Sequence, residues 1–385
     1  MRVDTVLSRR APSRPRPAPD DAAVRPAHYL VLLATVVVLN VVGVVMVLSA
    51  SSVVSLTTYG SAWYFFERQL IWTLLGAVAF AVALRIDYRR WRDWARPLLF
   101  VSAGLLLLVL IPHFGTYVAG SRRWLGLGSW RFQPTELAKL AVVLFTADLL
   151  TRREHELHDW RETLRPVTLV VAVLGGLVFL EPDLDSTILL GVIAAAVLLV
   201  GGVRLRHLAV AGGFGATLAL ILALSAPYRR ARLLTFLHPA AAAGNGGYQI
   251  VQSLIALGSG GVGGVGLGAG RAKWLFLPNA HTDFIFAVIG EELGLIGTLA
   301  VIGLFLTFAV VGVRAARRAP DRFGTLLAAG ITAWVVAQAA VNIGGVVGLL
   351  PVSGVPLPFV SFGGSSLVFT MLAAGILANV ARQAR

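Results

Sequence analysis

Long apolar runs constrain this chain of 385 residues more than any other feature, because they recur from one end of it to the other. A helix needs roughly 20 apolar residues to cross a hydrocarbon core about 30 Å thick. Runs of this kind lie near residues 29–49, 69–86, 97–112, 134–151, 165–180, 186–203, 207–225, 284–313, 324–350 and 360–381. The sequence therefore predicts an all-α polytopic membrane protein with about ten transmembrane helices.

The composition supports a membrane protein and excludes several other classes. Hydrophobic residues make up 57% of the chain and charged residues 14%, which leaves no sizeable soluble domain between the apolar runs. The chain has no cysteine, which excludes disulfides and thiolate metal ligands. A net charge of +14 would fit a nucleic-acid partner, but the basic residues lie mostly in short loops and therefore indicate topology instead.

The positions of lysine and arginine predict how the chain crosses the membrane. Cytoplasmic loops carry an excess of these residues. The basic loops are 85–96, 151–165, 204–207 and 314–322. Residues 1–27 are rich in arginine and proline and cannot bury a core, so we expect a disordered cytoplasmic tail. Residues 28–385 form the transmembrane domain, and both termini lie in the cytoplasm.

A long extracytoplasmic loop, residues 226–282, is predicted between the seventh and eighth helices. It far exceeds ordinary connections, and loops of this length are usually functional or disordered. The stretch "GYQIVQSLIALGSGG", which begins at Gly247, predicts an amphipathic helix at the outer membrane interface that ends at glycines. Residues 261–266 match G-x-G-x-x-G, but no strand precedes them and no βαβ unit surrounds them, so a dinucleotide site is excluded.

Basic residues in the outer loops break the topology rule and need another reason. An anionic ligand such as phosphate would supply one, and contact with lipid headgroups is the alternative. The outer cations are Arg122, Arg123, Arg131, Arg229, Arg230, Arg232, Arg271 and Lys273.

Asp283 lies where the long loop meets an apolar run of some thirty residues. Either Thr282 or Asp283 is a suitable N-cap for the helix that follows, and a carboxylate there is also stabilised by the helix dipole. The functional alternative is a carboxylate at the outer lip of a cavity, beside His281, that accepts a proton from a hydroxyl group.

Two further carboxylates, Glu291 and Glu292, follow about two turns deeper in the same run. A bare charge inside a membrane is costly, so each of them needs a partner. Lys139 is the only lysine within a predicted span. It could pair with Glu136 on its own helix at i, i+3, or bridge to Glu291 and Glu292 as part of a buried polar network.

The sequence "EPDLDST" places Glu181, Asp183 and Asp185 in one outer turn. Three carboxylates could hold a divalent cation through oxygen ligands, but Pro182 and Ser186 favour a capped turn between helices. No Ser-His-Asp or histidine metal-site pattern can be assembled from the spacing. The uncharged stretch 349–366 is rich in proline and glycine, and its serines, including Ser365, could present hydroxyls to a cavity.

Six motifs resemble the SEDS family, the FtsW and RodA type of peptidoglycan glycosyltransferases. They are "GSRRWLGLGSWRFQPTELAKL", "EPDLDST", "YRRARLLTFLHP", "GGYQIVQSLIALGSGG", "LPNAHTDFIFAVIGEELG" and "NIGGVVGLLPVSGVPLPFVSFGGSS". They occur in the family's order between about residues 30 and 382. The stretch "VGLGAGRAKWLFLP" favours the FtsW type.

The resemblance implies a multi-pass enzyme of the bacterial plasma membrane that serves cell-wall synthesis in division or cell shape. Such an enzyme polymerises lipid II into β-1,4 glycan strands at the outer face, with inversion and release of undecaprenyl pyrophosphate. It works with a class B penicillin-binding transpeptidase, and a divalent cation, Mg or Mn, is a possible cofactor. The family's essential aspartate matches Asp283, which would be the general base.

The resemblance and the outer cations together define the expected substrate-binding residues. Arg123 and Lys273 come first, because a pyrophosphate leaving group needs cations. Trp124 and Tyr248 could stack on sugar rings, although aromatic belts at the interface are the commoner use of such residues. The remaining candidates are Arg229, Gln252, His281 and Ser365.

Three positions depart from the family pattern and concern local turn geometry. Asp185 and Ser186 stand where the family usually has a glycine before threonine, Asn279 stands where glutamate is common, and Phe362 where tyrosine is common. Two rival functions also stay open. A lipid II flippase would depend more on Glu291, Glu292 and Lys139, and a scaffold that activates a penicillin-binding protein would not need Asp283.

Overall fold

The computed structural model describes residues 27–118, 121–127, 130–226, 230–231, 235–236 and 247–384. The tail predicted for residues 1–27 lies outside the described part of the chain, except for Ala27. Parts of the long loop 226–282, including Arg229 and Arg232, lie outside it as well.

Ten long helices coincide with the ten predicted apolar runs. They are α1 (Ala27–Tyr59), α2 (Tyr64–Arg85), α3 (Trp91–Leu110), α4 (Pro134–Arg152), α5 (Leu164–Leu180), α6 (Leu184–Val200), α7 (Leu205–Ser225), α10 (Ile285–Arg317), α11 (Arg322–Val346) and α12 (Gly364–Gln383). The long loop contributes the predicted amphipathic helix α9 (Tyr248–Gly260) and a short π-helical turn, η3 (Ala272–Phe276).

The described helices define a multi-pass membrane protein. Seven of them are long and apolar enough to cross a membrane, namely α1, α2, α3, α7, α10, α11 and α12. Helices α5 and α6 are apolar but have 17 residues each. Helix α4 has 19 residues and carries Glu136, Lys139 and Asp148. The number of spans predicted from the sequence, about ten, therefore stays a prediction.

A small β-sheet was not expected in an all-α chain. Strands β1 (Gly115–Val118), β2 (Ser121–Leu127) and β3 (Trp130–Phe132) pair antiparallel in the order β1-β2-β3. Aromatic residues and short turns favour such a meander, but the glycines and arginines of this stretch made it resemble an irregular loop. The fold is thus mostly helical, with a sheet between α3 and α4.

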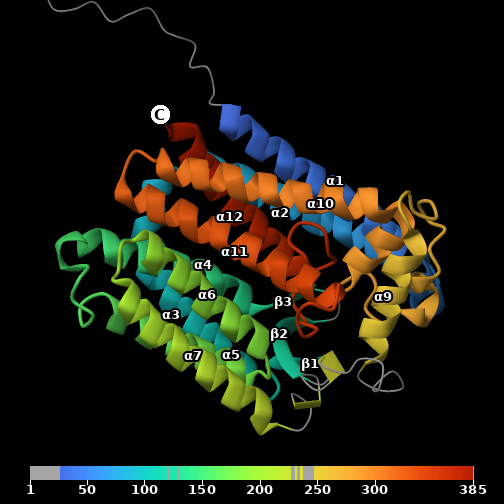
Figure 1. The fold of residues 1–385 in the computed structure, drawn as a ribbon, viewed down its shortest axis with the longest axis horizontal. Coiled ribbons are helices and arrows are strands. Elements are labelled where there is room, and N and C mark those ends of the chain that lie inside the picture. The colour runs from blue at the N-terminus through green and yellow to red at the C-terminus, as the bar shows by residue number, and fades with distance from the viewer. Residues whose placement is uncertain are drawn as a thin grey trace, which may run out of the picture.

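The helices form two groups that run along the long axis of the molecule (Figure 1). Helices α1, α2, α10, α11 and α12 lie together, and α3 to α7 form the other group. Helix α4 lies between the groups and is almost completely buried, because it packs on α3, α6 and α11. Helix α7 has no buried residue and lies at the periphery.

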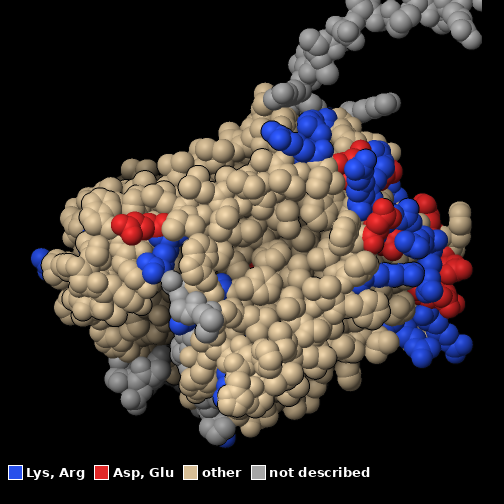
Figure 2. Space-filling view, turned by 180° about the vertical axis from the view of Figure 1, so that it is seen from behind, with Lys and Arg blue, Asp and Glu red and all other residues tan. Residues whose placement is uncertain are grey.

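Charged residues gather at one end of the molecule, beside a broad surface of other residues (Figure 2). The start of α1 and the end of α12 meet at this end, where an imidazole nitrogen of His28 lies 3.1 Å from the carbonyl oxygen of Ala381. An uncharged surface next to a charged end is typical of a membrane protein.

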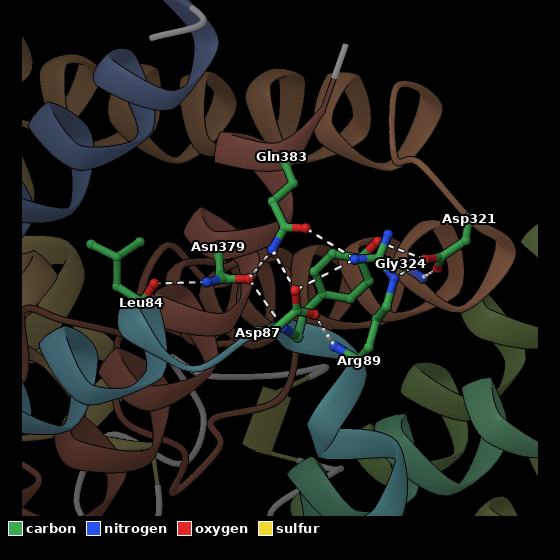
Figure 3. Close-up of polar contacts among 8 residues, drawn as sticks. Leu84, Asp87, Arg89, Asp321, Gly324, Asn379 and Gln383 are labelled. Atoms are coloured by element: carbon green, nitrogen blue, oxygen red, sulfur yellow. Dashed lines mark hydrogen bonds and ion pairs between the residues drawn. The ribbon is translucent and has the colours of Figure 1, made fainter. Parts of the chain in front are cut away.

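A polar cluster at the charge-rich end ties two turns between helices to the end of α12 (Figure 3). The guanidinium of Arg89 donates to Asp321 at 2.7 Å and to the side chain of Gln383 at 3.1 Å. Asp321 also accepts from the Gly324 N–H at 2.8 Å and thereby caps α11. The cluster fixes the α2–α3 and α10–α11 turns against the end of α12.

Candidate functional site

Asp283 lies on a turn whose backbone is held by the side chains of two distant residues. The residue at the N-cap of α10 is Phe284, so neither Thr282 nor Asp283 takes that position. The Asn342 side chain donates to the Asp283 carbonyl at 2.9 Å, and the Ser361 hydroxyl donates to the Thr282 carbonyl at 2.6 Å. The Asp283 side chain is half-buried. These bonds fix the backbone that carries the carboxylate at the rim of the helix bundle.

The turn before Asp283 depends on Asn279. Its backbone has φ of 58°, in the left-handed region that asparagine tolerates better than most residues. Its carbonyl accepts from the N–H groups of Thr282 at 3.1 Å and Phe284 at 3.2 Å. Asparagine in place of the glutamate common in the family therefore fits the local geometry.

His281 contributes an uncharged ring beside Asp283. The centre of its ring lies 4.4 Å from the ring centre of Phe65 and 5.8 Å from that of Phe362. Its buried Nδ1 has no hydrogen-bond partner. Burial lowers the pKa of His281 to about 4, so the imidazole is neutral at pH 7. His281 is therefore not a cation for an anionic substrate, and its predicted contact with substrate would be that of a neutral ring.

Arg123, in strand β2, forms a second polar cluster with the acidic turn. The Arg123 guanidinium donates to the carbonyl of Glu181 at 3.0 Å and to that of Pro182, and lies 3.7 Å from the Asp183 carboxylate. Asp183 caps α6 by accepting from the Ser186 N–H at 3.1 Å. The predicted capped turn is thus confirmed.

The three carboxylates of the acidic turn have different surroundings. Asp185 accepts from the Gly354 N–H at 3.1 Å. Glu181 is buried without a hydrogen bond, and its pKa is raised to about 9 by burial and by Asp183, although Arg123 lowers it. In the described residues no three His, Cys, Asp or Glu side chains are grouped as metal ligands, and a divalent cofactor stays a prediction.

Loop 347–363 connects the Asp283 turn with the cluster of Arg123 and the acidic turn. The Gly354 N–H, in the middle of the loop, donates to Asp185, and the Ser361 hydroxyl, near its end, donates to the carbonyl of Thr282. Ser365, just after this loop, accepts from the Gln133 N–H at 3.1 Å, next to the sheet. The loop therefore brings the Asp283 turn into the same framework as Arg123.

Lys139 pairs within its own helix and not with α10. Its ammonium lies 2.7 Å from the Glu136 carboxylate and donates to the Gln338 side chain at 2.8 Å. Gln338 donates in turn to the carbonyl of Pro356 at 3.0 Å, and Trp334 donates to Gln338. Of the two alternatives for Lys139, the structure has the intrahelical pair.

Glu291 and Glu292 hold the glycine-rich loop in place. Glu291 accepts from the backbone N–H groups of Arg271 at 2.7 Å and Ala272 at 3.0 Å. Glu292 accepts from the Gly268 N–H at 2.9 Å. The two carboxylates thus have backbone donors as partners, and they fix the base of the segment that leads to Asp283.

Lys273 is buried in the same network. Its ammonium lies 3.1 Å from Glu292 and 3.2 Å from the Ser49 hydroxyl, which donates to Glu292 at 2.7 Å. It also donates to the carbonyl of Gly268. This placement does not support the predicted role of Lys273 in binding substrate, because the ammonium already neutralises a buried carboxylate.

Helix α10 is broken at Gly294, and the glycine-rich loop fills the break. Gly294 has φ of 69° and ψ of −163°, far from helical values. The N–H of Val265 donates to the Glu291 carbonyl at 3.0 Å, and the N–H of Leu295 donates to the Gly261 carbonyl at 2.9 Å. Broken helices in membrane proteins need such replacement bonds. The sequence did not reveal this break, because one glycine in an apolar helix is common.

The other predicted site residues lie at the periphery of these clusters. Trp124 in β2 and both Tyr248 and Gln252 in α9 are half-buried. Sequence reasoning missed Asn342, Gln338 and Ser49. Their signal is a polar side chain inside an apolar span, which usually marks an internal contact.

Comparisons with known proteins define the class of this protein. The family model for FtsW, RodA and SpoVE, described as "Cell cycle protein", matches residues 29–385. The chain belongs to this family.

Its relatives narrow the assignment. The chain is 43% identical to the "Probable peptidoglycan glycosyltransferase FtsW" of Geobacter metallireducens, over 92% of this chain and 94% of that protein. It is 38% identical to the "Stage V sporulation protein E" of Bacillus subtilis, over 92% and 97%.

Solved structures agree with the fold. A structure described as "Structural coordination of polymerization and crosslinking by a peptidoglycan synthase complex" aligns with a TM-score of 0.74 and 31% identity, over 91% of this chain and 96% of that chain. The "Rod shape determining protein RodA" of Thermus thermophilus aligns with a TM-score of 0.66 and 28% identity, over 91% and 95%.

Proposed function

We propose that this chain is a peptidoglycan glycosyltransferase that polymerises lipid II into β-1,4 glycan strands at the outer face of the bacterial plasma membrane. The observation that carries the proposal is the half-buried Asp283, on a turn whose backbone is bonded to Asn342 and Ser361. The names of its relatives support the same activity, and their FtsW labels favour the division type.

In this mechanism the Asp283 carboxylate accepts the proton of the 4-hydroxyl of the acceptor sugar. The hydroxyl oxygen attacks the anomeric carbon of the donor, the bond to undecaprenyl pyrophosphate breaks, and the configuration inverts. A general base acts when it lies within hydrogen-bond reach of the proton that it removes. The rigid backbone at Asp283 would hold the carboxylate in such a position.

The proposed topology places ten spans across the membrane, with both termini in the cytoplasm and residues 226–282 outside. The contact between His28 and Ala381 supports this, because an even number of crossings returns the chain to the same side. A class B penicillin-binding protein is the proposed partner, and the solved synthase complex is consistent with one.

The proposal is tested with purified protein and its transpeptidase partner, supplied with labelled lipid II and followed by gel analysis of the glycan. Asp283→Asn keeps the shape of the side chain and removes the base, so polymer formation should fall by roughly 100-fold or more. Asp93→Asn is the control, because Asp93 is exposed in the first turn of α3 and has no proposed chemical role. Equal polymer from wild type and Asp283→Asn would contradict the general-base mechanism.

The flippase alternative loses its structural support. It depends on Glu291, Glu292 and Lys139 as a charged pathway. In the structure the two glutamates bind the glycine-rich loop, and Lys139 binds Glu136. A scaffold role stays distinguishable, since it predicts normal glycan synthesis by Asp283→Asn.

A further inference from the structure

Three consecutive large apolar side chains are exposed at the tip of the segment that follows the glycine-rich loop. Trp274, Leu275 and Phe276 are exposed by 61%, 61% and 54%. The residues on either side, Lys273 and Leu277, are exposed by only 5% and 3%. The tip (Trp274–Phe276) therefore projects from a buried base.

The base of the tip is fixed to α10 and α1. Glu291 binds the Ala272 N–H, and Glu292 and Ser49 bind the Lys273 ammonium. Leu275 has φ of 68°, a left-handed conformation that is unfavourable for a non-glycine residue. A strained leucine that is also exposed needs a reason outside the fold, because its side chain gains little from packing within the chain.

The expected depth of the tip in the membrane follows from the exposed apolar residues of α10. Exposed large apolar residues on this helix begin at Leu295 and end at Val313, just before Arg314. At 1.5 Å per residue this stretch is roughly 28 Å long, close to the thickness of the hydrocarbon core. The base of the tip is bonded to Glu291 and Glu292, immediately above Leu295. In Figure 1 this segment lies at the end of α10 opposite the C-terminus.

The chemistry of the tip matches the boundary between headgroups and hydrocarbon. Tryptophan is enriched at this boundary, and arginine binds lipid phosphates there. Arg271 is exposed directly before the buried base. Val262 and Leu267, in the adjoining glycine-rich loop, are exposed apolar residues as well.

We propose that the tip inserts into the outer leaflet of the membrane and anchors the loop that carries Asp283 to the lipid surface. The partner is a lipid bilayer with phosphate headgroups, contacted by Arg271 and entered by Trp274, Leu275 and Phe276. This anchor does not depend on the proposed enzymatic activity. If the tip bound a protein partner instead, it would lie in water when the purified chain is alone in a bilayer.

The test uses single-cysteine variants, which the chain allows because it has no cysteine. Leu275→Cys and, separately, Phe276→Cys carry a nitrobenzoxadiazole label in full-length protein, in nanodiscs of phosphatidylethanolamine and phosphatidylglycerol. Quenching by lipids brominated in the upper acyl chain reports contact with the leaflet. Leu306→Cys on the lipid-facing side of α10 is the positive control, and the exposed His155→Cys at the charged end is the negative control.

We expect quenching at both tip positions to reach at least half of that at Leu306→Cys and to exceed that at His155→Cys clearly. Quenching below half at both positions would overturn the proposal and favour a protein partner. Use of two tip positions keeps the test valid if one variant does not fold.

Discussion

Ion pairs differ between the two ends of the molecule. At the charge-rich end, Arg153–Glu162 and Arg89–Asp321 pair side chains that are exposed by a third or more. At the opposite end, Lys273–Glu292 is buried, and its carboxylate has further donors in Gly268 and Ser49. Exposed pairs contribute little to stability, whereas an unpaired buried charge is costly. The comparison indicates that the buried Lys273–Glu292 pair should matter far more for stability than the exposed pairs at the charge-rich end, although both ends use charges to fix local geometry.

The largest effect is expected where the buried pair is broken. Lys273→Met leaves the Glu292 charge without its counter-ion, which should destabilise the protein by about 3–5 kcal/mol. The double variant Lys273→Met/Glu292→Gln removes both charges and should recover a large part of this loss. Thermal unfolding in detergent measures both, and a double variant no more stable than the single one would contradict the pairing.

The glycine-rich loop gives the next effect. A Cβ added at Gly264 would lie 2.2 Å from the Glu292 carbonyl oxygen, and φ there is 80°, so Gly264→Ala should cost about 1–3 kcal/mol. Gly263→Ala is the matched control, because nothing lies within 4 Å of its added Cβ. Unfolding midpoints compare the two variants. Similar midpoints would show that the loop is not packed into the break of α10.

Glu181 should make stability depend on pH. Its folded pKa of about 9 lies above the unfolded value of 4.5, so the cost of keeping it protonated grows as pH rises from 4.5 to 9. Glu181→Gln removes this cost, so its stability relative to wild type should increase as pH rises through that range. Unfolding midpoints at pH 5, 7 and 8.5 provide the measurement. A constant difference between the two proteins would show that Glu181 is ionised in the fold.

The smallest effect is expected at the charge-rich end. Arg153→Met and Glu162→Gln should each change stability by less than about 1 kcal/mol, because both side chains are partly in water and screened by salt. A loss as large as that of Lys273→Met would remove the distinction between the two ends.

The sequence was sufficient for features that depend on local pattern. Apolar length located the ten long helices of the described residues, and the pattern of Tyr248 to Gly260 located α9. The capped turn before α6 was also predicted, from Pro182 and Ser186, and the structure shows that Asp183 is the residue that caps the helix. The match to the family's motif singled out Asp283, and the structure then described the turn that carries it.

Features that depend on distant contacts could not be predicted. The partner of Lys273 is Glu292, together with Ser49, which precedes Lys273 by more than two hundred positions in the sequence. The break at Gly294 exists because another segment supplies the lost backbone bonds, and a local pattern does not contain that information. The sheet was missed because β1 and β3 have only four and three residues, and the glycines and arginines of the stretch made it resemble an irregular loop.

The break at Gly294 divides α10 into two mechanical units. The half after it is a membrane-embedded rod, whereas the half before it shares its hydrogen bonds with the glycine-rich loop. Asp283 therefore lies next to the half that is bonded to the glycine-rich loop. A displacement of that loop by lipid or by a partner would act on this half before the rod, and the bonds of the Asp283 turn to Asn342 and Ser361 would resist it.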